Sequence, residues 1–69
     1  MPALYIREQG STIKRVSERI VVVNKGKEIL EIPIADVDSL AVFGSVQITT
    51  PALQMLMERG IDVNYFSYA

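Results

Sequence analysis

Hydrophobic and polar residues alternate in short segments along the first half of the chain, a pattern typical of β-strands. Residues 20–23 are all β-branched, a composition that favours a strand. Asn24 to Lys27 predict a hairpin turn in which Gly26 is available for a positive φ, and a loop of either two or three residues fits. The expected strands span residues 3–6, 11–16, 19–23 and 28–32.

The second half predicts a β-α-β unit. Residues 40–43 form a continuous apolar run ended by Gly44, which indicates a buried strand, and residues 61–65 alternate as in a half-buried one. If these two strands are neighbours in one sheet, we expect them to run parallel. Pro33 cannot donate a hydrogen bond, so it ends the preceding strand or marks a sheet edge. Residues 34–39 are expected to form an irregular turn, with Asp36 capping one helical turn.

A short helix is predicted between those strands. Thr50 is expected to cap its N-terminus with the side-chain oxygen, and Pro51 then takes the first helical position. Gly60 is expected to end the helix in a left-handed conformation. One apolar face at helical spacing is formed by Leu53, Leu56 and Met57.

These elements predict a mainly β domain of the α+β class, with two small twisted sheets and one helix. A chain of 69 residues holds at most one domain, residues 1–69, and its core is barely sufficient. The aromatic segment before Ala69 reads as an interrupted strand, so we expect a domain truncated at its C-terminal end. The expected core consists of Ile20, Val22, Ile29, Ile32, Leu40, Val42, Leu53, Leu56, Ile61 and Val63.

Composition narrows the function classes. Seven basic and eight acidic residues give a net charge of −1, which lacks the basic character of a dedicated nucleic-acid binder. The chain has no cysteine and no histidine, which removes disulfides, thiol chemistry and the commonest general base and metal ligand. The absence of cysteine fits a reducing cytoplasm. Apolar runs are far shorter than the roughly 20 residues that a membrane span needs, so no membrane association is expected.

The remaining polar residues offer weak candidates for catalysis. Asp36 and Asp38, joined by Glu31, are the nearest approach to a metal site, but side chains two residues apart point to opposite sides of a strand. A solvated turn with a helix cap is the favoured interpretation. No catalytic, cofactor-binding or metal-binding residue is therefore predicted.

Two groups of residues are candidates for binding partners. If they share one face, basic side chains could contact DNA phosphates, although a solvated face with interspersed glutamates is favoured. These are Arg7, Lys14, Arg15 and Arg19. The aromatic residues near the C-terminus could stack on bases, but completing a core or forming a dimer interface is favoured. These are Tyr65, Phe66 and Tyr68.

A family resemblance rests on the stretch Phe43-Gly-Ser-Val-Gln-Ile-Thr-Thr-Pro-Ala-Leu53, followed by Leu56 and Glu58-Arg-Gly-Ile61. This stretch resembles the signature of the CRISPR-associated endonuclease/integrase of spacer acquisition, the first-numbered Cas protein. The resemblance extends back through residues 30–34, 19–22 and 4–6, and thus covers essentially the whole chain. Its most specific part is Gln47-Ile-Thr-Thr-Pro-Ala52.

The resemblance implies an N-terminal β domain that dimerises and positions catalytic domains for antiviral spacer acquisition. In that family the metal-binding Glu, His and acidic residues lie in a separate C-terminal helical domain, so none transfers to this chain. Some members carry a Tyr that helps to bracket a DNA duplex end where this chain has Gln9, which puts that bracket in doubt. For the full-length protein, the resemblance implies Mg or Mn, DNA and the second-numbered Cas protein as partners.

Two other interpretations stay open. One is a free-standing, β-rich interaction module of the adaptor or antitoxin type, which a stop codon after Ala69 would support. Continuation of the reading frame into a helical domain with Glu and His would support the integrase. The other is a small subunit of an unrelated enzyme, which is disfavoured because no residues form an acid–base or metal set.

Overall fold

The strand-forming residues of the first half give four consecutive strands in the computed structural model, which describes residues 3–67. They are β1 (Ala3–Ile6), β2 (Ser11–Val16), β3 (Arg19–Asn24) and β4 (Lys27–Pro33). The second half adds a 3-10 turn, three strands and one helix. They are η1 (Ile34–Asp36), β5 (Ser39–Phe43), β6 (Val46–Ile48), α1 (Thr50–Glu58) and β7 (Asp62–Phe66).

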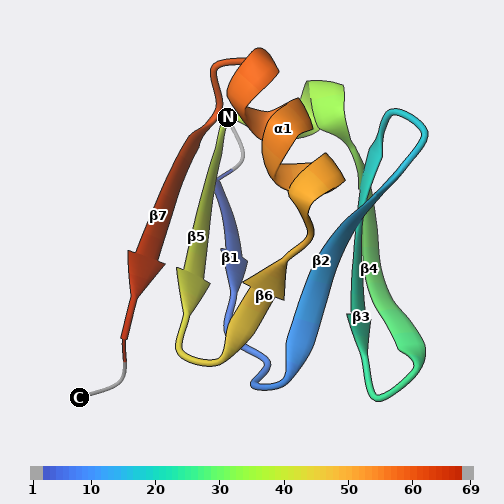
Figure 1. Cartoon of the computed structure of the whole chain (residues 1–69), viewed down its shortest axis with the longest axis vertical. Coiled ribbons are helices and arrows are strands. Elements are labelled where there is room, and N and C mark those ends of the chain that lie inside the picture. Colours follow the sequence, from blue (N-terminus) through green and yellow to red (C-terminus); the bar gives the residue numbers. More distant parts are fainter. Residues whose placement is uncertain (1–2, 68–69) are drawn as a thin grey trace.

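The strands form two sheets, as predicted. Sheet A has the order β1-β5-β7 with all strands parallel, and sheet B has the order β4-β3-β2-β6. In Figure 1, sheet A lies to the left, the hairpins of sheet B lie to the right, and α1 lies between them. The β-α-β unit is confirmed, because β5 and β7 are parallel neighbours with Leu40 opposite Val63.

Strand β6 was not predicted. It has three residues and pairs in parallel with β2, so the connection from β5 to β7 first adds a strand to sheet B. Only Val46 of this strand is buried, and Gln47 is exposed. Three residues are too few to show the alternation that predicts a strand. In the structure, this segment is a strand because it pairs with β2.

The hairpin between β3 and β4 has a two-residue loop, Lys25-Gly26, and both residues have positive φ (53° and 77°). This conformation matches the twist of the flanking strands. A β-bulge follows, because Val23 pairs with Glu28 while Val22 pairs with Leu30. Ile29 is the extra residue and is 47% exposed, so its assignment to the core was wrong.

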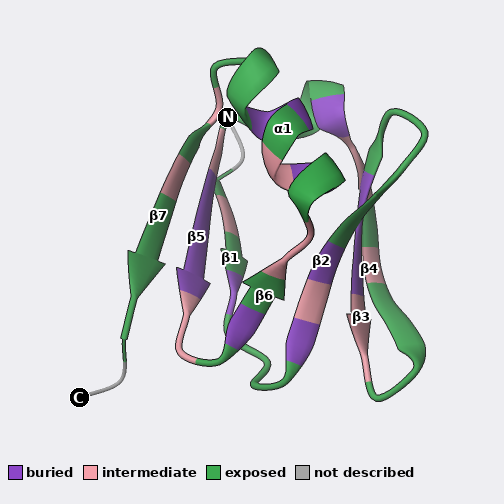
Figure 2. Ribbon diagram, in the orientation of Figure 1, coloured by how far each residue is buried: buried purple, intermediate pink, exposed green. Residues whose placement is uncertain are grey.

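The core lies between the sheets and beneath one side of α1 (Figure 2). Five expected residues are buried in it, three more pack partly buried against it, and Leu53 is half-buried. The buried ones are Ile20, Val22, Leu40, Val42 and Leu56; those that pack against them are Ile32, Ile61 and Val63. Buried residues outside the expected core include Ile6, Ile13, Ile34, Val46, Ala52 and Met55. All of these residues are aliphatic.

The helix begins one residue earlier than predicted. Thr49 is the N-cap, because its Oγ1 accepts a hydrogen bond from the Ala52 N–H at 3.4 Å. Thr50 is therefore the first helical residue and Pro51 the second, which corrects the assignment of Thr50 as the cap. The residue that caps η1 is likewise Pro33, and Asp36 is its last residue rather than a cap.

The apolar face of α1 is also shifted, since Ala52, Met55 and Leu56 are buried whereas Met57 is exposed. Gly60 ends the helix as predicted, with φ of +67°. Its N–H donates to the Met57 carbonyl, and the following N–H donates to Leu56, which is the Schellman arrangement. This ending turns the chain directly into β7.

Candidate functional site

Aromatic side chains lie outside the core throughout the described part of the chain. Tyr5, Tyr65 and Phe66 are 59%, 62% and 49% exposed, and Phe43 is half-buried. Residues that are opposite each other in paired strands lie on the same face of a sheet. The register therefore places Tyr5, Phe43 and Phe66 on the face of sheet A that points away from the core, whereas Tyr65 is opposite the buried Val42.

Three of these rings form a contiguous group, which we call the aromatic row: Tyr5, Phe43 and Phe66. The Phe43 and Phe66 rings stack with centroids 5.0 Å apart and planes at 15°, close to the spacing of neighbouring strands. The Tyr5 ring lies 6.3 Å from Phe43 at 33°. The Arg7 guanidinium carbon lies 5.4 Å from the Phe43 ring centroid, a cation–π contact. The row thus crosses all three strands of sheet A.

A polar clasp closes one end of the domain, where the turn after β1 meets the turn after β5. The Gln9 side-chain amide donates to the carbonyls of Phe43 (2.7 Å) and Arg7 (2.9 Å), and its Oε1 accepts from the Ser45 N–H at 2.7 Å. The Gly10 N–H donates to the Ser45 carbonyl at 2.7 Å. We call this set the Gln9 clasp. It holds the end of the aromatic row against the start of β2.

The same turn is anchored to sheet B. The Asn24 amide donates to the Gln9 carbonyl at 3.0 Å and to the Oγ of the buried Ser11 at 2.9 Å. The Gln9 side chain therefore stabilises contacts within this domain. Both of its polar atoms are engaged within the chain, at the position where the family resemblance had put a DNA-bracketing role in doubt.

The predicted basic residues do not gather on one face. Arg7 lies over the aromatic row, and Arg19 pairs with Glu31 at 3.4 Å. Lys14 and Arg19 follow the outer face of sheet B, since they are opposite Val21 and Val16 in the β2–β3 ladder. Arg15 is opposite Ile20 and so lies on the other face.

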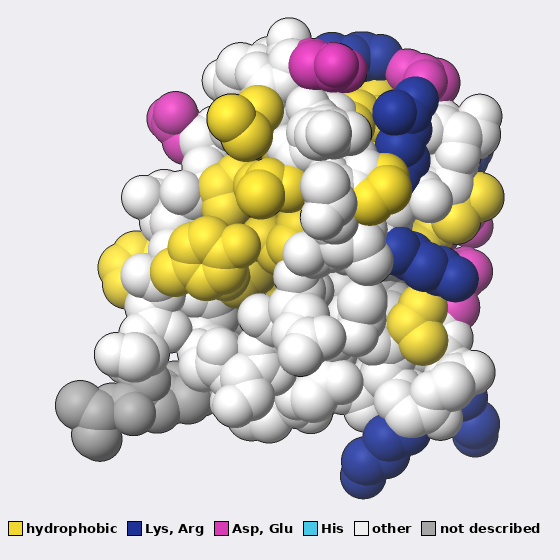
Figure 3. Space-filling model, viewed as in Figure 1, with side chains coloured by type: hydrophobic (Ala, Val, Ile, Leu, Met, Phe, Trp, Pro, Cys, Tyr) yellow, Lys and Arg dark blue, Asp and Glu magenta, His cyan; other side chains and the backbone are white. Residues whose placement is uncertain are grey.

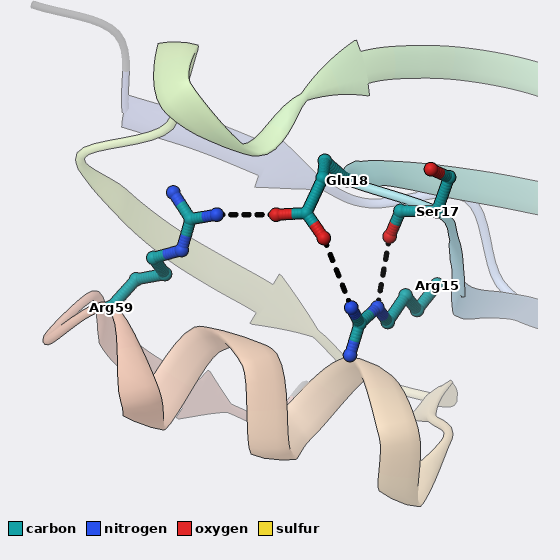
Figure 4. A network of polar contacts seen from close by, with 4 residues as sticks. All are labelled: Arg15, Ser17, Glu18 and Arg59. Atoms are coloured by element: carbon teal, nitrogen blue, oxygen red, sulfur yellow. Dashed lines mark hydrogen bonds and ion pairs between the residues drawn. The ribbon is translucent and has the colours of Figure 1, made fainter.

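Arg15 takes part in a second network (Figure 4), between the β2–β3 turn and the end of α1, at the opposite end of the domain from the turns of the clasp (Figure 1). The Glu18 carboxylate accepts from Arg15 at 3.0 Å and from Arg59, which follows α1. Arg15 also donates to the Ser17 carbonyl at 2.8 Å. All three charged side chains are partly exposed, so each pair contributes at most about 1 kcal/mol. The network ties the β2–β3 turn to the end of the helix.

The carboxylates do not form a metal site in the described residues. Glu31, Asp36 and Asp38, the nearest candidate, are not brought together, and within residues 3–67 no three acidic side chains converge to hold an ion. Mg²⁺ and Mn²⁺ are held mainly by carboxylate and other oxygen ligands, so without such a group the described residues do not fit either ion. No helix in this part of the chain is long and apolar enough to cross a membrane.

The predicted interface residues lie at the edge of sheet A. Tyr65 and Phe66 belong to β7, which among residues 3–67 pairs with β5 on one side only, and Tyr68 lies outside the described residues. Figure 3 shows hydrophobic side chains gathered over the β5–β7 side, whereas Lys and Arg gather over the side of sheet B. The sequence analysis missed Tyr5 and Phe43. Tyr5 could have been found, because it alternates with Leu4 and Ile6 in a strand whose other face is apolar.

Comparison with known proteins places these features in a family. The family model described as CRISPR associated protein Cas1 matches residues 4–69. The CRISPR-associated endonuclease Cas1 1 of Thermus thermophilus is 33% identical over 64 residues, which cover 93% of this chain and 20% of that protein. The chain thus spans about one fifth of the length of the curated relatives it matches.

Solved structures share the fold. A structure titled as a TtCas1–DNA complex has a TM-score of 0.82 at 20% identity, over 99% of this chain and 23% of that chain. A Cas6-RT-Cas1–Cas2 complex has a TM-score of 0.89 at 20% identity, over 93% of this chain and 7% of that one. The arrangement of two sheets and one helix is therefore that of known structures, and the predicted resemblance is confirmed.

Proposed function

This chain belongs to the Cas1 family, and we propose that it serves there as the N-terminal dimerisation and scaffolding domain of a spacer-acquisition endonuclease/integrase. The observation that carries the proposal is the family match over residues 4–69 in a chain that spans about one fifth of its curated relatives. A folded unit of this size, without a set of catalytic side chains, is suited to hold other parts of a larger protein in place.

We propose that catalysis belongs to other parts of the whole protein. The donor set supports this division, because the described residues bring no group of three acidic side chains together and the chain has no histidine. Mg or Mn would be held elsewhere in the full-length protein. Tested alone, the chain is expected neither to cleave nor to join DNA.

Dimerisation is proposed to use the β7 edge of sheet A. An unpaired strand edge beside exposed apolar side chains favours association, and Tyr65 and Phe66 supply such side chains. Lys and Arg gather over the opposite side of the view in Figure 3, and the one charged residue of β7 is Asp62 at its start, three residues from Tyr65. Two copies meeting at this edge about a two-fold axis would form a closed pair.

We propose that the whole protein acts in the cytoplasm on DNA, together with the second-numbered Cas protein. The titles of the similar structures name DNA and Cas2 as components of Cas1 complexes, which supports these partners. Arg7 and Lys14 take no part in the ion pairs of residues 3–67, so they are the better phosphate contacts. Arg15 and Arg19 would first have to break their ion pairs with Glu18 and Glu31, respectively, before contacting a phosphate.

A chimera tests the proposed role. Residues 4–69 would replace the aligned segment of the T. thermophilus relative, and DNA integration would be measured with the second-numbered Cas protein present. The chimera is expected to dimerise and integrate DNA, whereas the same relative with the segment deleted should do neither. If the deletion variant integrates as well as the chimera, the scaffolding role is wrong.

A further inference from the structure

We propose that the Tyr5 end of the aromatic row, together with Arg7, binds an unpaired base and the adjoining phosphate of single-stranded DNA. The choice of DNA as the nucleic acid rests on the proposed function. The site itself rests on the placement of rings and charge in this chain. It lies at the β1 edge of sheet A, on the opposite edge from the proposed dimer contact.

The first argument is that aromatic residues are kept out of the core. Large apolar rings usually fill protein interiors, yet the buried cluster here is made of aliphatic side chains. Tyr5 is 59% exposed although its neighbours Leu4 and Ile6 face inward. A contiguous group of exposed rings is a feature of binding surfaces rather than of a solvated sheet face.

The second argument is the direction of the rings. A centroid distance of 5.0 Å at nearly parallel planes means that Phe43 and Phe66 form an offset stack across neighbouring strands. Tyr5 continues the row on edge strand β1, with no further strand beyond it in the described residues. A planar base that stacks on Tyr5 would extend the row by one member.

The third argument is the space beside Tyr5. A hollow of about 460 Å³ is lined by Tyr5 and Arg7 and, across it, by Ile29 and Leu30 of β4. The bulge in β4 exposes Ile29 there, which gives the hollow an apolar wall opposite the ring. Glu8 also lines the hollow. A base therefore finds apolar surface, while the DNA backbone must approach from the Arg7 side.

The fourth argument is charge. The ion pairs within residues 3–67 engage Arg15, Arg19 and Arg59, and none of them involves Arg7. The Phe43 ring holds the Arg7 guanidinium at 5.4 Å, which leaves its N–H groups available for a phosphate next to the stacked base. Stacked aromatic rings beside a cation are what single-strand binding surfaces present, and they tolerate any base sequence. A duplex offers no free base face within its stack.

The experiment uses the 69-residue chain and a short oligothymidine carrying one 2-aminopurine, whose fluorescence falls on stacking. Tyr5→Leu should weaken binding by about tenfold or more, the effect of losing one aromatic stacking partner, whereas Tyr5→Phe should bind like the parent. Arg7→Gln should reduce the slope of log binding constant against log salt concentration by about the amount expected for one phosphate contact. Lys25→Gln, at the hairpin tip, is the matched control. Glu8→Gln should tighten binding because it removes a like charge from the hollow.

A second readout does not depend on variants: photocrosslinking of a bromodeoxyuridine oligomer should attach to the peptide that contains Tyr5. The proposal is overturned if Tyr5→Leu binds like the parent, or if a duplex of the same sequence binds as tightly as the single strand. It is also overturned if Tyr5→Leu converts a dimer to a monomer, since the row would then be a protein interface. None of these results affects the chimera test, so the two proposals fail separately.

Discussion

Gln9 joins two turns that lie far apart in the sequence, and its removal should lower the stability of the whole domain. Gln9→Ala deletes two hydrogen bonds donated to the Phe43 and Arg7 carbonyls and one accepted from the Ser45 N–H. Each hydrogen bond contributes about 0.5–1.5 kcal/mol net, and the exposed position of Gln9 favours the low end because water can replace the side chain. The expected loss is about 1.5 kcal/mol, or roughly 6–12 °C in Tm.

Gln9→Glu is the sharper variant because it keeps the size of the side chain. It retains an acceptor for the Ser45 N–H but places a carboxylate oxygen near the carbonyls of Phe43 and Arg7, to which the amide donated. At neutral pH it should therefore destabilise at least as much as Gln9→Ala.

Urea and thermal unfolding followed by circular dichroism measure both variants. Gln54→Ala, at an exposed helix position, is the matched control and should change stability by less than about 0.5 kcal/mol. The reasoning is refuted if Gln9→Ala and Gln54→Ala have the same effect, or if Gln9→Glu is as stable as the parent.

Three further outcomes follow from the structure. Thr49→Ala should lower the free energy of unfolding by about 1 kcal/mol because it removes the helix cap, whereas Thr50→Ala should change it little. Equal unfolding midpoints for the two variants would mean that the cap is misplaced. Gly60→Val should cost at least as much as Thr49→Ala, because a β-branched residue is strained at a φ of +67°, and an unchanged midpoint would contradict this. With Mg²⁺ or Mn²⁺, the chain alone should neither cleave nor join branched DNA. Metal-dependent cleavage that disappears on Asp36→Asn or Asp38→Asn would contradict that expectation.

Local patterns were sufficient where a segment's own residues decide its structure. The β-branched run in β3, the glycine in the β3–β4 turn and the apolar run in β5 each predicted an element that the structure contains. The helix was placed within one residue, but Thr49 and Thr50 are equally good caps by residue type. The start of the helix is decided between them by the packing of Ala52 and Met55 in the core.

The candidate site could be predicted only in part, because it depends on pairing between distant strands. Tyr5, Phe43 and Phe66 become neighbours through the register of three parallel strands, and no local pattern fixes that register. The Gln9 contacts span 34 and 36 residues. For the basic residues, the sequence left open whether they share one face, and strand alternation in the structure places Lys14 and Arg15 on opposite faces of sheet B.

Sedimentation of the 69-residue chain from low to high micromolar concentration tests the central claim, a dimerising scaffold domain, most directly. We expect a species of twice the 7.7 kDa chain mass that dissociates on dilution. The double change Tyr65→Ser with Phe66→Ser should shift it to monomer at the β7 edge, and Tyr5→Ser at the opposite edge should leave the dimer intact. A folded chain that sediments at 7.7 kDa at every concentration would contradict the account.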